Sequence, residues 1–125
     1  MIELAGNLLI EDGELLLIYR SDEEHWEVPG GKVEDDESPT QAAVREAEEE
    51  IGVEVELEKP FYTGEFMKDS EMFLWHGYIV STDEEPSLEE EKFSDLEWVD
   101  EERLEELDLA PNLRQIEPAL RKVLG

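Results

Sequence analysis

Cysteine is absent from this chain of 125 residues. Its absence excludes disulfide bonds, thiolate metal sites and cysteine nucleophiles. No apolar run approaches the roughly 18 residues that a membrane-spanning helix needs, so we expect no membrane association. The first residues, Met1 to Leu4, lack the basic and apolar segments of a signal peptide. We therefore expect a cytoplasmic protein.

Basic residues are scarce. Ten of them face 37 acidic residues, for a formal net charge of -27. This charge argues against binding to nucleic acids or anionic membranes. It also makes the folded chain repel itself, and dissolved salt relieves that repulsion. A disordered acidic tail would give the same total, but the acidic residues are spread along the chain among apolar ones. We therefore hypothesise a halophilic protein from an organism with high cytoplasmic salt.

The hydrophobic fraction of 39% is enough for one core, and we find no repeat or linker, so residues 1–125 are expected to form a single domain. Apolar runs on either side of Asp12-Gly13 predict a β-hairpin. The expected extended segments are residues 5–10, 15–19, 25–29, 53–58, 61–66, 72–80 and 93–99. Residues 82–90 are expected to form a polar connection, and residues 100–107 a short helix or turn.

Two longer helices are expected. Ser38 as N-cap, Pro39 at the first helical position and Gln41 three residues after the cap predict a helix that ends at Ile51, before Gly52. Near the end of the chain, apolar residues recur at helical spacing: Leu113, Ile116, Leu120 and Val123. Pro118 lies inside that segment and is expected to kink it or to remove a hydrogen bond. This order of elements predicts an α/β fold with a mixed sheet and helices on its faces.

Three glutamates, Glu46, Glu49 and Glu50, fall on one face of the first helix, because steps of three and four residues return to the same side. Like charges at that spacing cost stability, and a hard divalent cation such as magnesium would reverse the sign of this effect. A solvated acidic face is the alternative, and helix geometry alone leaves both interpretations open.

From Gly31 to Val53 the chain has the sequence GKVEDDESPTQAAVREAEEEIGV. This segment resembles the Nudix box, with eight positions of the pattern matched and no insertion. The matching residues are Gly31, Glu37, Arg45, Glu46, Glu49, Glu50, Gly52 and Val53. Ala47 departs from the pattern, which usually has a bulkier aliphatic residue there. The resemblance implies a Nudix-type α/β/α sandwich with a mixed central sheet, in which residues 31–53 form loop, helix and loop.

The resemblance also implies a magnesium cofactor, with Mn²⁺ as a substitute. The implied ligands are the main-chain carbonyl of Gly30 and the carboxylates of Glu46, Glu49 and Glu50. A further glutamate from outside the box often completes such sites, and we favour Glu91 over Glu90 and Asp95. The implied catalytic set is Glu46, Glu49, Arg45 and Glu37, with Glu46 as our first choice for the base.

In the family pattern the arginine pairs with acidic residues of the preceding loop, so Arg45 is expected to hold Glu37, and Glu34 as well, against the helix. Arg20 and Lys32 are our candidates for substrate binding, with neutralisation of nearby carboxylates as the alternative. Trp26, Tyr62, Phe66 and Trp75 are either stacking platforms for a base or core residues. His25 is assigned no role.

The implied reaction is hydrolysis of a phosphoanhydride bond in a nucleoside diphosphate linked to another moiety. Residues 65–70 lack the proline and the tyrosine that mark relatives specific for ADP-ribose and for dinucleoside polyphosphates. This favours a nucleoside triphosphate, including an oxidised one, in nucleotide housecleaning. The alternatives are a pyrophosphatase for ADP-ribose or dinucleoside polyphosphates, a Nudix module that senses a nucleotide without cleaving it, and an acidic nucleic-acid mimic. Family members are often dimers, which leaves a homodimer open.

Overall fold

The computed structural model describes all 125 residues, which form seven strands and three helices. None of the helices is long and apolar enough to cross a membrane. In chain order the elements are β1 (Ile2–Glu11), β2 (Glu14–Arg20), β3 (His25–Glu27), β4 (Gly30–Lys32), α1 (Pro39–Ile51), β5 (Glu56–Lys68), β6 (Glu71–Ser81), β7 (Phe93–Val99), α2 (Glu101–Glu106) and α3 (Pro111–Leu124).

The strands form one mixed sheet with β1 at its centre. β1 runs parallel to β6, whereas its pairings with β2 and β4 are antiparallel. β5 continues the sheet beyond β6, and β2 pairs with both β3 and β7. The predicted mixed sheet is therefore confirmed.

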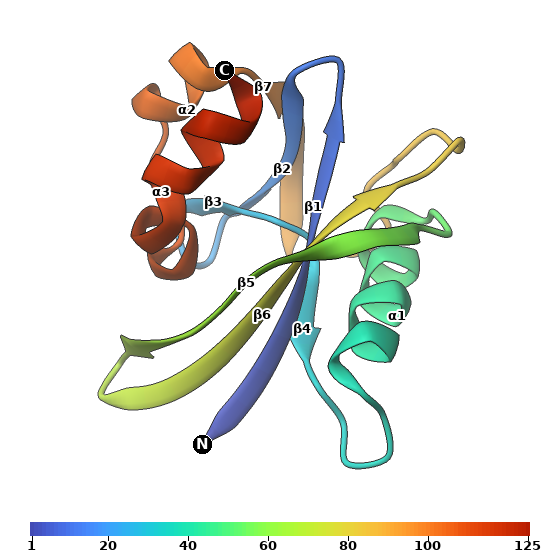
Figure 1. Cartoon of the computed structure of the whole chain (residues 1–125), viewed down its shortest axis with the longest axis vertical. Coiled ribbons are helices and arrows are strands. Elements are labelled where there is room, and N and C mark those ends of the chain that lie inside the picture. Colours follow the sequence, from blue (N-terminus) through green and yellow to red (C-terminus); the bar gives the residue numbers. More distant parts are fainter.

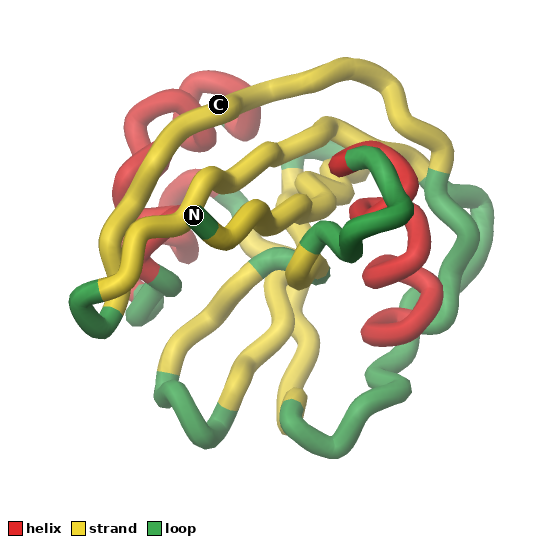
Figure 2. Tube along the Cα trace, turned by 90° about the horizontal axis from the view of Figure 1, so that it is seen from below, coloured by secondary structure: helices red, strands yellow, loops and turns green.

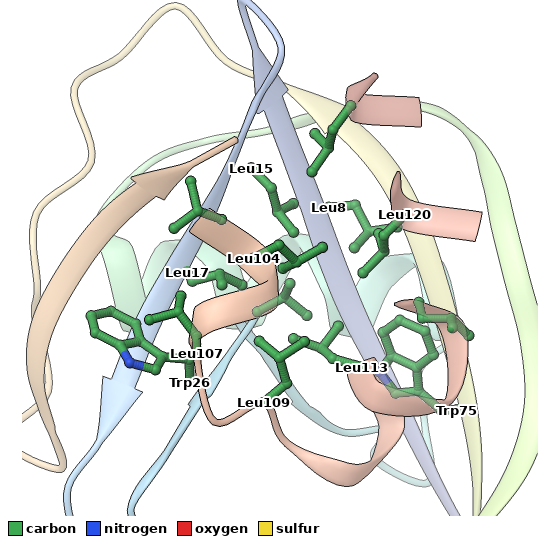
Figure 3. Packing of buried hydrophobic residues seen from close by; sticks show 14 residues of the cluster. Leu8, Leu15, Leu17, Trp26, Trp75, Leu104, Leu107, Leu109, Leu113 and Leu120 are labelled. Carbon is green, nitrogen blue, oxygen red and sulfur yellow. The ribbon is translucent and has the colours of Figure 1, made fainter. Parts of the chain in front are cut away.

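Helices cover both faces of this sheet, α1 on one and α2 with α3 on the other (Figures 1 and 2). Alternate residues of a strand point to opposite faces, so neighbouring leucines enter different cores. Leu8 packs in a cluster with the leucines of α2 and α3, which Figure 3 shows, while Leu9 packs in a second cluster with Ala47 and Ile51 of α1. The predicted three-layer α/β/α arrangement is thus confirmed.

The turn before β2 and the two ends of α1 form as predicted from the local sequence. Asp12 and Gly13 both have positive φ, 50° and 77°, in the turn between β1 and β2. Ser38 and Gln41 form a capping box at the start of α1, and Gly52 ends the helix in the left-handed conformation with φ 68°. The loop before α1 and the helix itself are therefore positioned by local sequence.

The prediction of two strands at 53–58 and 61–66 is wrong, because a single strand, β5, extends from Glu56 to Lys68. Proline lacks the N–H that a central strand must donate, so Pro60 would not fit in the middle of the sheet. β5 is instead an edge strand, and its register against β6 shifts on both sides of Pro60, between Leu57 and Lys59 and between Pro60 and Tyr62. These irregularities accommodate the proline within one strand.

The C-terminal helix α3 also differs in one detail from its prediction. Pro118 lies inside it without ending it, and Leu113, Ile116 and Leu120 are buried as expected. Val123 is 40% exposed, and Leu124 is buried in its place. Position 124 lies four residues beyond Leu120 and so continues the buried stripe.

Candidate functional site

Two consecutive glycines in β4 press the backbone against β1 and α1. A Cβ atom on Gly30 would overlap the carbonyl oxygen of Ala5, and one on Gly31 would lie 2.6 Å from the carboxyl carbon of Glu46. A side chain at position 30 would force β4 away from the backbone of β1, and a side chain at position 31 would displace the carboxylate of Glu46. The glycines therefore allow the carboxylate of Glu46 to pack directly against the backbone of β4.

Asn7 connects the three elements that surround these glycines. It is fully buried in β1, and its side-chain amide donates to the carbonyl oxygens of Pro29 at 3.0 Å and of Ala43 in α1 at 2.9 Å. No role was predicted for Asn7 from the sequence. The available signal was a single amide within the otherwise apolar run from Ala5 to Ile10.

The three glutamates of α1 differ sharply in exposure. Glu50 is fully buried, whereas the side chains of Glu46 and Glu49 are 13% and 46% exposed. One oxygen of Glu50 accepts a hydrogen bond of 2.8 Å from the backbone N–H of Gly30. Burial nevertheless raises the pKa of Glu50 to about 9, and burial also raises the pKa of Glu46. A charged carboxylate at Glu50 thus requires a nearby cation.

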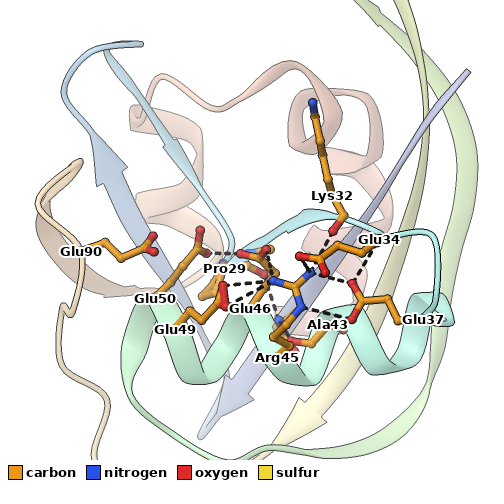
Figure 4. A network of polar contacts seen from close by, with 12 residues as sticks. Pro29, Lys32, Glu34, Glu37, Ala43, Arg45, Glu46, Glu49, Glu50 and Glu90 are labelled. Atoms are coloured by element: carbon orange, nitrogen blue, oxygen red, sulfur yellow. Dashed lines mark hydrogen bonds and ion pairs between the residues drawn. The ribbon is translucent and has the colours of Figure 1, made fainter.

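Arg45 joins the loop before α1 to the glutamates on the helix (Figure 4). Its guanidinium donates to both oxygens of Glu37, at 2.6 and 3.1 Å, to one oxygen of Glu46, at 2.8 Å, and to both oxygens of Glu49, at 3.0 and 3.4 Å. Glu34 lies within ion-pair distance at 3.7 Å. The hydrogen bond from Arg45 holds the pKa of Glu37 below its usual range, and Glu37 in turn raises the pKa of Arg45.

A lysine and a glutamate from outside the box approach Glu50. The ammonium of Lys92 lies 3.5 Å from Glu50 Oε2 and 3.5 Å from Glu90 Oε1. Both of these oxygens are buried and have no hydrogen-bond partner. Glu91, which the sequence analysis preferred, is exposed, so the structure brings Glu90 rather than Glu91 to the cluster. The charge run at 89–91 offered no basis for choosing between them.

The donor set suits a hard divalent cation, because every candidate ligand is an oxygen atom. The unpaired, buried Oε2 of Glu50 is the strongest structural indication that a cation belongs there. No three carboxylates converge on one point as the side chains stand, since Glu46 and Glu49 turn toward Arg45 while Glu50 turns toward Gly30. An ion bound by all three would therefore replace part of the Arg45 network.

A cavity of about 430 Å³ opens beside Glu46, Gly30 and Gly31. Four of the ten basic residues of the chain line it, namely Arg20, Lys32, Lys68 and Lys92. Three aromatic residues of β5 and β6 also line it, namely Phe66, Phe73 and Trp75. The rings of Phe66 and Phe73 stack with centroids 5.2 Å apart. The cavity thus combines cations, flat apolar surfaces and the exposed edge of the carboxylate cluster.

Arg20 and Lys32, the two cations expected to bind substrate, both line this cavity. Arg20 also pairs with Asp22 at 3.0 Å. The side chain of Lys32 extends away from the carboxylate network, while its carbonyl oxygen accepts from Arg45 (Figure 4). Lys68, which the sequence analysis did not select, reaches the cavity from β5 and pairs with Glu23 at 2.8 Å.

The candidate aromatic platforms separate into core and cavity residues. Trp26 packs in the core against Tyr19, with ring centroids 5.2 Å apart. Phe66 faces the cavity, and Trp75 belongs to the core while forming part of the cavity wall. His25 and Glu27, on the same side of β3, also line the cavity and contact each other at 2.7 Å. The alternation of a strand would have placed these two side chains together.

Residues 4–120 match the family model described as the NUDIX domain. A protein of Escherichia coli (strain K12) named CTP pyrophosphohydrolase is 34% identical over 115 residues, which cover 89% of this chain and 84% of that protein. An 8-oxo-dGTP diphosphatase of the same strain is 32% identical over 87 residues, 66% of this chain and 67% of that protein. A MutT-like protein of Streptomyces ambofaciens is 45% identical over 58 residues, but these cover only 38% of that protein.

Solved structures are similar over nearly the whole chain. A MutT structure from work on Aliivibrio salmonicida and Vibrio cholerae has a TM-score of 0.81 and 27% identity, covering 97% of this chain and 96% of that one. The MutT protein of Methanosarcina mazei Go1 has a TM-score of 0.84, covering 97% and 93% of the two chains. At 23% identity, this second likeness concerns the fold alone.

Proposed function

The chain belongs to the NUDIX family and is a pyrophosphohydrolase, and from that premise we propose that it hydrolyses a phosphoanhydride bond of a nucleoside triphosphate with Mg²⁺ as cofactor. The proposed substrates include an oxidised nucleotide, whose removal would be a housecleaning function. The observation that carries this proposal is the cavity beside Glu46, in which four cations and three aromatic side chains meet. A nucleoside triphosphate presents a chain of anionic phosphates and a flat base, which match these two kinds of side chain.

The relatives support this choice of substrate class. The names of the two Escherichia coli proteins specify CTP and 8-oxo-dGTP, and both compounds are nucleoside triphosphates. ADP-ribose and dinucleoside polyphosphates are the alternative substrates. A module that only senses a nucleotide is the remaining alternative, and it would have no use for three adjacent carboxylates on α1.

The residues that would hold the ion are Glu46, Glu49 and Glu50 with the carbonyl oxygen of Gly30, and Mn²⁺ would serve as a substitute. We propose Glu90 as the additional ligand in place of Glu91, because its buried Oε1 lacks a hydrogen bond and lies 3.5 Å from the same ammonium that contacts Glu50. When bound, Mg²⁺ supplies neutralisation of the phosphate charge and polarisation of the phosphorus atom.

The protein's own groups would perform the other tasks. Glu46 lines the cavity and has a pKa raised by burial, so it is placed to orient the attacking water and accept its proton. Arg45 and Glu37 hold the loop against α1 and thereby keep Glu46 and Glu49 in position. Arg20 and Lys32 would bind phosphate oxygens from the other side of the cavity.

The proposal is tested with a panel of CTP, dGTP, 8-oxo-dGTP, ADP-ribose and a dinucleoside polyphosphate, assayed with Mg²⁺ in molar KCl. Glu46→Gln is compared with Glu48→Gln, an exposed glutamate on the same helix. We expect pyrophosphate release from a nucleoside triphosphate and a loss of kcat of about a hundredfold or more in Glu46→Gln only.

Each other outcome contradicts a different part of the proposal. A preference for ADP-ribose or the dinucleoside polyphosphate would refute the substrate class. Equal activity of Glu46→Gln and Glu48→Gln would refute the assignment of the site. Tight nucleotide binding without hydrolysis would instead support the sensing module.

A further inference from the structure

A cation of the protein already lies against the most deeply buried carboxylate of the site. The side chain of Glu50 is 1% exposed, and its Oε2 has no hydrogen-bond partner. The nearest positive charge is the ammonium of Lys92, 3.5 Å away. Arg45 pairs with Glu46 and Glu49 on the same helix but not with Glu50. Lys92 is therefore the positively charged group that lies closest to the buried Oε2 of Glu50.

Lys92 also has neighbours other than Glu50. Its ammonium contacts a second buried, unpaired oxygen, that of Glu90, also at 3.5 Å. The same side chain is 42% exposed and lines the cavity beside Glu46. The ammonium thus lies between the buried carboxyl group of Glu50, one buried oxygen of the partly exposed Glu90 and the cavity beside Glu46.

We propose that Lys92 is a resident cation that competes with the divalent ion for Glu50 and so sets the affinity of the chain for that ion. This inference rests on the metal site of the proposed function. An ion that binds Glu50 must displace the ammonium or tolerate its positive charge nearby, and both weaken binding. Lys92 is then a positioning residue for the metal site, and it lowers ion affinity in the absence of nucleotide.

Titration with Mn²⁺ alone tests this inference, using calorimetry on full-length protein in molar KCl without nucleotide. Lys92→Met removes the ammonium and keeps the apolar stem. Lys59→Met is the matched control, because Lys59 is exposed on β5 and the change in net charge is the same. Lys92→Arg retains the positive charge.

We expect Lys92→Met to bind Mn²⁺ at least about tenfold more tightly than wild type. The Mn²⁺ affinities of Lys59→Met and Lys92→Arg should remain close to that of wild type. If Lys92→Met does not fold without metal, Lys92→Gln replaces it, with the same expected tightening.

Two results would overturn the inference and can be told apart. If wild type binds Mn²⁺ and Lys92→Met binds it no more tightly than Lys59→Met, Lys92 is only a structural partner and the proposed metal site stands. If neither wild type nor Lys92→Met binds Mn²⁺, the metal site of the proposed function fails together with the inference.

Discussion

Glu50 combines two requirements that oppose each other in a metal-free protein. Glu50 lies on the buried face of α1, which disfavours a charged side chain, and this burial raises its pKa to about 9. Binding of a divalent ion requires the charged form. Ionising Glu50 in the folded protein therefore has a free-energy cost, which a bound ion would reduce. This cost is measurable as a dependence of folding stability on pH.

The sign of that dependence follows from proton binding. Between the ordinary pKa of 4.5 and about 9, folded Glu50 holds a proton that the unfolded chain releases, so folding stability falls as pH rises through this range. We predict that, in a chelator, wild type loses stability relative to Glu50→Gln by about 1 kcal/mol per pH unit. Urea unfolding of both proteins at several pH values between 5.5 and 8.5 measures it. A constant difference would contradict the prediction.

Arg45 depends on its planar set of donors. It holds Glu37 through two nitrogen atoms and contacts Glu46 and Glu49 through a third. Lysine keeps the charge but cannot reproduce this geometry. We predict that Arg45→Lys lowers kcat about ten- to a hundredfold, as loss of outer partners does in other metal sites. Arg103→Lys, which changes an ion pair with Glu97, is the control and should retain activity. Full activity of Arg45→Lys would show that charge alone suffices.

At the scale of elements, β1 holds the site together because this single strand contacts β4, β6 and α1. Its register opposes Gly6 to Gly30, and Asn7 bonds the residue before Gly30 and the middle of α1. Since these elements converge on a single side chain, a change at Asn7 should alter stability and catalysis together.

We predict that Asn7→Ala lowers the free energy of unfolding by about 1–3 kcal/mol, because it removes two buried side-chain hydrogen bonds, to the carbonyl oxygens of Pro29 and Ala43. The backbone N–H of residue 7, which also donates to Pro29, is unchanged. The same change should lower kcat, since Gly30 and Glu46 lose their common anchor. Urea unfolding and steady-state kinetics at saturating substrate measure the two effects. Lower stability with unchanged kcat would mean that Asn7 supports the core but not the site.

At the scale of the whole molecule, the charge of -27 poses a difficulty for an enzyme whose substrate is an anion. The fold reduces the repulsion of an anionic substrate locally, because four of the ten basic residues line one cavity. Other acidic residues gather away from this cavity, for example in a concave surface lined by Glu54, Glu56, Asp83 and Glu84 with Ser81 and Thr82. We propose that this charge reflects adaptation to salt.

We predict that the midpoint of thermal unfolding rises steadily between low and molar KCl, because salt screens repulsion among surface carboxylates. The double variant Glu56→Gln with Asp83→Asn removes two charges from the concave acidic surface and should show a weaker rise. Differential scanning calorimetry measures both proteins. A midpoint that does not rise with salt in wild type would count against salt adaptation.

The sequence by itself determined the features that depend on neighbours along the chain. The capping box of Ser38, the left-handed Gly52 and the shared face of Glu46, Glu49 and Glu50 follow from helical geometry, and the turn at Asp12-Gly13 follows from the preferences of its two residues. The Nudix pattern lies within one such local segment. The family, the fold class and the core of the candidate site were therefore predictable.

Only the tertiary structure decided which distant side chains join that segment. Asn7 reaches Ala43, Lys92 reaches both Glu50 and Glu90, and Pro60 lies in a strand because β5 is at the edge of the sheet. Periodicity cannot separate Glu90 from Glu91 in a charge run, nor show that Glu50 is buried while Glu49 is exposed. Those differences arise from how the layers pack, since burial and electrostatic pairing depend on distances across the fold.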